Sequence, residues 1–379
     1  MKKNALRTVK ILSLLIAVAV TLGVLQRFVF YHADHNSQRL QGFYLEEEDS
    51  LDLVILGASE VYSDFAPGYA YANSGVTSYL FATQSNSILN YKSQLKNILS
   101  RQDPDLIVIE LNAAVYGDEE EATKPANLHN YSDNVPLDSI KLDYILNTVP
   151  EHKLEYLFPI LKYHSAWEEL STSPKYRGTV EQDEKRGYNC LKGILNETGI
   201  YQSSELSFNS ELPDLADNKQ PLTAVEEEGL RDLLQYCKDE GLTNVVFARF
   251  PHIVVTRTYD RFERSNTVGD IVAEYGYDYL NLERDIALTG LDEKNDFYNL
   301  DHLNVYGQKK FTAYLTDYLK GQYGLKTHTL TDGEKAEWDD CARWYDAYYR
   351  YSDSLIRQGE TRELSEDSDL IETLKSYLS

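Results

Sequence analysis

The sequence predicts an α/β protein with three layers, in which helices cover both faces of a parallel five-stranded sheet. Short apolar runs rich in branched residues alternate with segments of helical periodicity along most of the 379 residues. Strands that alternate with helices favour a parallel sheet that is buried on both faces. A hydrophobic content of 42% is enough to form a large core.

The N-terminal segment is expected to anchor the chain in a membrane. Four basic residues precede an apolar run over residues 11–25, and they are Lys2, Lys3, Arg7 and Lys10. This run approaches the length of about twenty residues that spans a bilayer. The basic flank predicts a cytoplasmic N-terminus, so the body of the protein would be extracytoplasmic. A cleaved signal peptide is the competing interpretation, but residues 25–27 make a poor cleavage site.

The remaining elements follow from hydrophobic patterning and turn residues. Strands are expected at residues 51–56, 69–73, 105–111, 244–250 and 277–282, and helices at residues 83–100, 223–239, 258–275 and 305–322. We therefore divide the chain into a cytoplasmic tip and signal-anchor helix (1–30), a polar tether (31–50), an α/β domain (51–325) and a C-terminal helical extension (326–379). The domain contains a long, partly helical insertion between its third and fourth strands, at about 113–221. The extension begins with a capping box, Thr331 to Glu334.

Charge and cysteine content exclude several classes of function. The formal net charge of −24 argues against nucleic-acid binding, which needs a basic surface. The three cysteines, Cys190, Cys237 and Cys341, have no C-x-x-C spacing, so no zinc or redox motif is present. No P-loop, HExxH or GxGxxG motif occurs, so we expect no metal or nucleotide cofactor.

Ser59 is a candidate nucleophile. It lies two residues after Gly57, where the first predicted strand ends. Ligands of parallel sheets gather at the carboxyl ends of the strands, and the next helix would favour negative charge there. Val61 occupies the last position of a G-x-S-x-G motif, so an α/β-hydrolase nucleophile elbow is not supported. The alternative role for Ser59 is an N-cap of the following helix.

His302 is the candidate base. The stretch D-F-Y-N-L-D-H-L-N-V-Y-G at residues 296–307 follows the fifth predicted strand and opens a helix. A histidine here would lie at the same sheet edge as Ser59, and a carboxylate behind it would orient its ring. Asp301 and Asp296 are the nearby acids. The alternative is that Asp301 or Asn304 only caps the helix and His302 is incidental.

Two further residues are candidate oxyanion donors. Gly75 follows the second predicted strand and could present a backbone N–H, and Asn112 follows the third and could present its amide. Ordinary turn chemistry also explains glycine and asparagine at such positions.

Ser59, Gly75, Asn112 and His302, in this order, resemble the four sequence blocks of the SGNH (GDSL-like) hydrolase family. The resemblance covers residues 51–325 and implies a flavodoxin-like fold and serine acyl chemistry. Together with an N-terminal anchor, the chain looks most like the extracytoplasmic branch that contains the D-alanyl transfer protein of lipoteichoic acid synthesis and polysaccharide O-acetyltransferase or esterase partners. The resemblance therefore implies acetyl or D-alanyl esters of envelope polysaccharide or teichoic acid as substrates, and a membrane-bound O-acyltransferase as a partner.

One position departs from the family pattern. The family places Asp three residues before the histidine, and this chain has Asn299 there. Asparagine can orient a histidine but cannot stabilise an imidazolium by charge. We expect Asp301 to replace the missing carboxylate, with Asp296 and Asn299 as alternatives. The rival hypothesis is an envelope protein of the same fold that is catalytically weak or inactive and binds glycan or a membrane acyltransferase.

Overall fold

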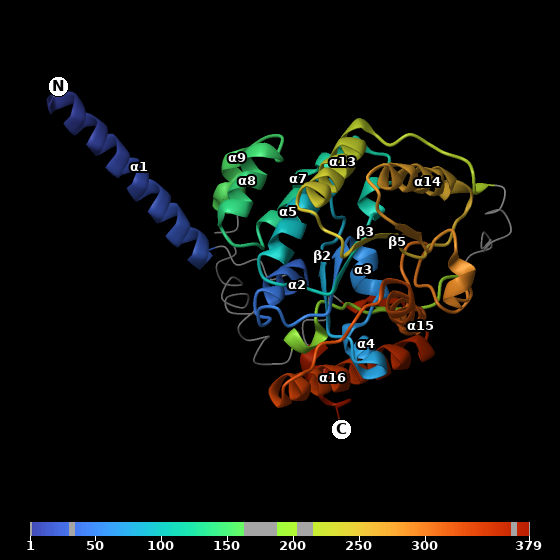
Figure 1. The fold of residues 1–379 in the computed structure, drawn as a ribbon. Helices are drawn as coiled ribbons and strands as arrows, with labels where there is room; N and C mark the ends of the chain where they lie inside the picture. The colour runs from blue at the N-terminus through green and yellow to red at the C-terminus, as the bar shows by residue number, and fades with distance from the viewer. Residues whose placement is uncertain (1, 30–34, 163–187, 203–214, 365–369, 379) are drawn as a thin grey trace.

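A parallel sheet of five strands forms the centre of the protein (Figure 1). The structure is a computed structural model, and it describes residues 2–29, 35–162, 188–202, 215–364 and 370–378. The strand order is β2-β1-β3-β5-β6, and every neighbouring pair is parallel. The strands are β1 (Leu53–Gly57), β2 (Ser78–Ala82), β3 (Leu106–Glu110), β5 (Val245–Arg249) and β6 (Tyr279–Asn281). The predicted α/β class with a parallel five-stranded sheet is confirmed.

The second strand differs from the prediction. Residues expected to form a strand at 69–73 belong to helix α4 (Pro67–Ser74), and the strand follows at β2. Pro67 occupies the first turn of this helix, where its missing N–H costs nothing. Gly75 ends the helix in the left-handed conformation, with φ of 74°, and its N–H donates to Tyr71 O. Pro67 and Gly75 therefore begin and end a helix, although the alternation of residue types over 69–73 resembles a strand.

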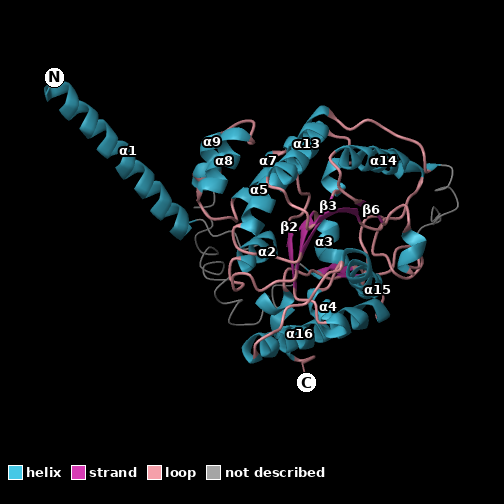
Figure 2. Ribbon diagram, in the orientation of Figure 1, coloured by secondary structure: helices cyan, strands magenta, loops and turns pink. Residues whose placement is uncertain are grey.

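Helices cover both faces of the sheet (Figure 2). One face packs against α2 (His35–Phe43), α5 (Ile88–Leu99), α13 (Ala224–Asp239) and α14 (Tyr259–Glu274). The other face packs against α3 (Ser59–Asp64), α4, α15 (Val305–Tyr318) and α16 (Asp332–Arg357). Val54 and Leu56 of β1 belong to the apolar cluster on the face covered by α2, α5, α13 and α14, and Leu53 and Ile55 belong to the cluster on the other face. This alternation of β1 side chains explains why the strand reads as a continuous apolar run.

The C-terminal extension is part of the same core. Thr331 caps α16 and forms the expected capping box with Glu334. Trp338, Cys341, Tyr345 and Tyr348 of this helix are buried, and α16 packs against α4. Beyond α16, strand β7 (Arg362–Glu363) and helix α17 (Leu370–Lys375) complete the extension. Strand β7 pairs antiparallel with β4 (Glu197–Thr198), so the extension contacts the insertion.

The segment expected to be a tether is folded over much of its length. Helix α2 buries Leu40 and Phe43 against the sheet. Arg39 is also buried, and its guanidinium donates to Ala82 O and Gly193 O. Polar side chains that find backbone partners can be buried at little cost. The tether interpretation was therefore wrong for residues 35–43, because composition alone did not reveal these partners.

The insertion is mostly helical where the structure describes it, apart from strand β4. It contains α6 (Glu119–Thr123), α7 (Pro125–Ser132), α8 (Ser139–Asn147), α9 (Lys153–Leu157) and the short 3-10 turns η1 (Asn112–Ala114), η2 (Pro159–Leu161) and η4 (Tyr188–Leu191). Residues 163–187 and 203–214 of the expected insertion lie outside the described residues.

Helix α1 (Lys2–Val29) extends away from the body of the protein (Figure 1). Its segment Ala5–Leu25, with a mean hydropathy of 2.3, is long and apolar enough to cross a membrane, a property that signal sequences share.

Candidate functional site

Ser59 is the first residue of helix α3, immediately beyond the carboxyl end of β1. The N-cap of this helix is Ala58, and no side chain caps it. The Ser59 hydroxyl therefore does not serve as the cap, which was the alternative role considered for it. Gly57 allows β1 to pack closely against β3 and α3 here, because a Cβ at this position would lie 2.9 Å from the Cβ of Glu110 and 2.5 Å from Val61 Cγ2.

His302 contacts Ser59 directly. Its Nε2 lies 2.9 Å from Ser59 Oγ, although 243 residues separate the two in sequence. The loop that carries His302 closes through a bridge between Phe297 and Leu303, and Asn304 caps α15 directly after it. A helix start and a short bridge therefore hold the loop on both sides. The structure thus brings together the two residues that the sequence singled out as nucleophile and base.

The carboxylate that contacts His302 is Glu197, not Asp301. Glu197 Oε1 lies 2.9 Å from His302 Nδ1, and only 1% of the Glu197 side chain is exposed. Strand β4 holds Glu197 by pairing with β7. The neighbouring Asn196 strengthens this position, since its N–H donates to Tyr348 Oη and its amide donates to Ser352 Oγ on α16. The expectation that Asp301 orients His302 is therefore corrected.

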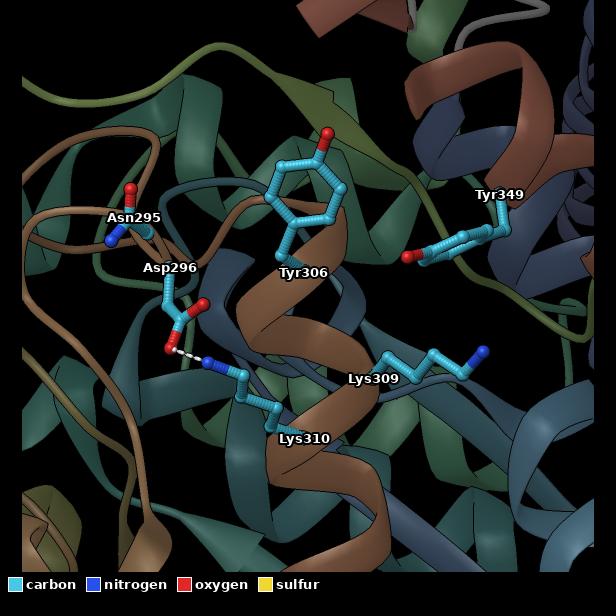
Figure 3. A pocket seen from close by; sticks show the side chains of 6 residues that line it. All are labelled: Asn295, Asp296, Tyr306, Lys309, Lys310 and Tyr349. Atoms are coloured by element: carbon cyan, nitrogen blue, oxygen red, sulfur yellow. Dashed lines mark hydrogen bonds and ion pairs between the residues drawn. The ribbon is translucent and has the colours of Figure 1, made fainter. Parts of the chain in front are cut away.

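Asp301 and Asp296 have other partners. Asp301 forms an ion pair of 2.7 Å with Arg261 of α14. Asp296 forms an ion pair of 2.6 Å with Lys310, and Figure 3 shows this contact in a separate pocket of about 350 Å³. That pocket lies along α15 and α16, and neither Ser59 nor His302 lines it.

Asn299 shapes the loop backbone. Its Oδ1 accepts hydrogen bonds of 2.8 Å from the N–H groups of Asp301 and His302, and its Nδ2 lies 3.3 Å from His302 Nδ1. Such an Asx turn fixes the backbone and points the side chains of Asp301 and His302 to different partners. Of the three orienting candidates, Asn299 alone thus has a contact with the His302 ring, beside the stronger contact of Glu197.

The surroundings of His302 favour its charged form. Burial lowers its pKa, but Glu197 acts in the opposite direction and, with Glu60 and Asp64, raises the pKa to about 10. Asp64 lies behind the loop and accepts a hydrogen bond of 2.9 Å from Leu303 N–H. Burial raises the pKa of Asp64 well above its usual value. At neutral pH an imidazolium is therefore the favoured form of His302.

A buried polar cluster lies beneath Ser59 at the carboxyl ends of β3 and β5. Its members are Glu60, Glu110, Asn112, Arg249, His252 and Glu283, each at most 3% exposed. Arg249 lies at its centre, with Nε 3.1 Å from Glu283 Oε2. Its Nη1 donates to Asn112 Oδ1 and lies 3.7 Å from Glu110 Oε1. Burial, and then the charge of Glu60, raise the pKa of Glu110 to about 8.

Glu60 connects this cluster to Ser59. Its Oε2 lies 3.5 Å from Ser59 Oγ, its Oε1 lies 3.5 Å from His252 Nε2, and it accepts a hydrogen bond from the Asn112 amide. Burial raises the pKa of Glu60, but His252, His302 and Arg249 outweigh burial and lower it overall. The Asn112 amide, which was expected to donate to an oxyanion, thus donates to the Glu60 carboxylate instead.

Gly75 is not part of the site. It ends α4 and precedes β2, so it lies at the amino end of that strand, on the opposite edge of the sheet from Ser59. Its N–H is already used in the helix cap. The expected oxyanion role of Gly75 is therefore wrong, as a consequence of the misplaced second strand.

Several residues of the site were missed by the sequence analysis. Arg249 and His252 belong to the stretch R-F-P-H at residues 249–252, at the carboxyl end of the fourth predicted strand, so the argument that selected Ser59 also applied to them. Glu60 follows Ser59, and Glu110 lies at the carboxyl end of the third predicted strand. Glu197 carried no such signal, because it lies in the insertion outside any motif.

Comparisons with known proteins leave the family open. No family model matches the chain, and no curated protein matches it. Within the described residues, no group of three histidine, cysteine, aspartate or glutamate side chains is arranged to hold a metal ion. The chemistry of the site therefore has to be argued from the contacts of Ser59, His302 and Glu197.

Proposed function

We propose that this protein is a membrane-anchored, extracytoplasmic serine acyl hydrolase or O-acyltransferase that acts on acyl esters of cell-envelope glycans. The observation that carries the proposal is the continuous chain from Ser59 Oγ to His302 Nε2 and from His302 Nδ1 to Glu197, with 2.9 Å at each step. A hydroxyl, an imidazole and a buried carboxylate in this order form the general arrangement of nucleophile, base and orienting group. The SGNH-like order of motifs adds acetyl or D-alanyl groups as the expected acyl groups.

The proposed reaction has two halves. Neutral His302 accepts the Ser59 proton while Ser59 Oγ forms a bond to the ester carbonyl carbon. The tetrahedral intermediate collapses, the alcohol leaves with the proton from His302, and an acyl-Ser59 remains. Water or a sugar hydroxyl then attacks the acyl carbon, His302 accepts its proton, and Ser59 is released as the proton returns to it. Glu197 stabilises the imidazolium formed in each half.

The oxyanion would lie close to Glu60. The Asn112 amide donates one of its two N–H groups to the Glu60 carboxylate, and the charge of that carboxylate would oppose an oxyanion beside it. The mechanism therefore includes a movement or protonation of Glu60 on substrate binding. The Ser59 N–H at the start of α3 is the other donor we assign.

A fluorophosphonate probe tests the proposal on the full chain in a mild non-ionic detergent. We expect labelling and 4-nitrophenyl acetate hydrolysis in the wild type, and loss of both in Ser59→Ala. Ser74→Ala is the matched control, because Ser74 is a helical serine whose hydroxyl bonds only to its own helix at Ala70 O. Labelling that persists in Ser59→Ala would refute a nucleophilic Ser59.

A second candidate function is a catalytically weak or inactive envelope protein that binds glycan or a membrane O-acyltransferase. The raised pKa of His302 and the contact between Glu60 and Asn112 favour it, because both oppose catalysis at neutral pH. Absence of labelling at every pH between 6 and about 10.5, the range over which His302 loses its proton, would support this candidate.

A further inference from the structure

Exposed leucine side chains gather on one part of the insertion. Outside α1, the described part of the chain exposes seven large apolar side chains, and five of them lie within residues 137–161. We call these five the leucine patch: Leu137, Leu142, Leu146, Leu154 and Leu161. Single exposed leucines are common on soluble proteins, but a cluster of this kind marks an interaction surface.

The helices that carry the leucine patch are firmly attached to the domain. On α8, Tyr144 is buried and its hydroxyl donates to Asn90 Oδ1 at 2.7 Å, while Asp143 pairs with Lys96 of α5 at 2.7 Å. On α9, Tyr156 is buried and stacks on His129 with ring centroids 3.9 Å apart. The inner sides of both helices therefore contact the core, and Leu142, Leu146 and Leu154 remain exposed on their outer sides.

The leucine patch lies beside the candidate membrane span. Helix α1 contacts the turn η2, which carries Leu161; η2 in turn contacts α9, and α9 contacts α8. The C-terminal end of α1 is the end that approaches the body of the protein (Figure 1). Where a chain leaves the bilayer, the adjoining surface faces the boundary between headgroups and acyl chains. Exposed leucines on short helices are suited to that boundary, because their side chains enter it while polar side chains remain in water.

We propose that the leucine patch inserts into the bilayer interface at the C-terminal end of α1. The body of the protein is then attached to the membrane at two places, the span and the patch, and its orientation relative to the bilayer is fixed. The patch helices pack on the core, so this orientation is transmitted to the whole domain. The proposal does not depend on chemistry at Ser59.

Site-specific fluorescence in lipid nanodiscs tests the proposal on the full chain. The background is Cys190→Ser, because Cys237 and Cys341 are buried. Single cysteines replace Leu14, Leu146 or Leu288, whose exposed fractions are 64%, 62% and 63%, and each carries an NBD label. Leu14 reports on the span, Leu146 on the patch, and Leu288 is a matched exposed leucine on another part of the domain. Leu154→Cys repeats the patch measurement on α9.

We expect doxyl-labelled phosphatidylcholine to quench NBD at positions 14, 146 and 154 at least twofold, and to leave position 288 unchanged. Quenching at position 14 with aqueous behaviour at 146 and 154 would overturn the proposal without affecting the span. Positions 146 and 154 that are aqueous in nanodiscs but protected in native membranes would assign the patch to a protein partner and equally overturn insertion into lipid. Aqueous behaviour at position 14 would also overturn it, because the argument begins from a membrane next to α1. Thermal unfolding of each labelled variant verifies that it is folded.

Discussion

Replacing Glu197 with glutamine should change both the pKa of His302 and the rate of acyl transfer. Glu197 is the main group that raises the pKa of His302 to about 10, against the opposing effect of burial. Two unit charges 2.9 Å apart interact by on the order of 5 kcal/mol at an effective dielectric constant of about 20. Part of this is offset because glutamine still accepts a hydrogen bond. We expect the His302 pKa to fall by about two to three pH units, or roughly 3–4 kcal/mol.

The pH dependence of the rate gives this change its signature. Because neutral His302 is the proposed base, wild-type activity should rise with pH and reach half of its maximum only near pH 10. In Glu197→Gln the half-maximal rate should be reached near pH 7 to 8, since its base loses the proton earlier. The plateau itself should be lower by roughly three to four orders of magnitude, because the imidazolium of the transition state has lost its carboxylate.

The pKa shift and the lower rate are both measured by fluorophosphonate labelling between pH 6 and about 10.5. This range includes the expected His302 pKa of the wild type and of Glu197→Gln. Asp301→Asn is the matched control, because Asp301 adjoins His302 in sequence but pairs with Arg261. Its profile should follow that of the wild type. The reasoning is refuted if Asp301→Asn shifts the profile and Glu197→Gln does not.

Two further predictions concern stability. Gly57→Ala should lower the free energy of unfolding by about 1–3 kcal/mol, because the new methyl group would overlap Val61, whereas Gly321→Ala, with open space at its Cβ position, should change it little. Both are measured by urea denaturation, and equal midpoints would contradict the close packing at Gly57. Arg249→Met should cost about 3–5 kcal/mol, because it leaves buried carboxylates without their counter-charge, while Arg231→Met at the surface should cost under about 1 kcal/mol. An Arg249→Met protein with wild-type thermal stability would contradict this, because it would show that the buried carboxylates lose their charge by taking up protons.

The charge at the candidate site has a consequence for substrate binding. His302 is surrounded by Glu197, Glu60 and Asp64, which stabilise its proton. A substrate that displaces Glu60 would remove one of these negative charges and lower the pKa of His302 toward neutrality. Activation of the proposed base would then be coupled to occupancy of the site.

Agreement between sequence and structure is best where local patterns decide. Continuous apolar runs identified four of the five strands of the sheet, because a strand buried on both faces has no polar alternation. The capping box of α16 is a local hydrogen-bond pattern, and the helix begins where this pattern predicts. The prediction misplaced the second strand because the ends of α4 are set by the backbone conformations of Pro67 and Gly75. The apolar pattern of the residues between them does not reveal this helix.

The sequence by itself determined the α/β class, the apolar N-terminal helix and the two residues that meet at the sheet edge. Ser59 and His302 were accessible because Ser59 directly follows a strand and His302 shortly precedes a helix, and both elements can be read locally. Only the tertiary structure decided which acid contacts His302. Glu197 lies 105 residues from His302 in the chain and is placed by pairing β4 with the C-terminal β7. The contact between Glu197 and His302 depends on how distant segments pack, so neither residue spacing nor composition predicts it.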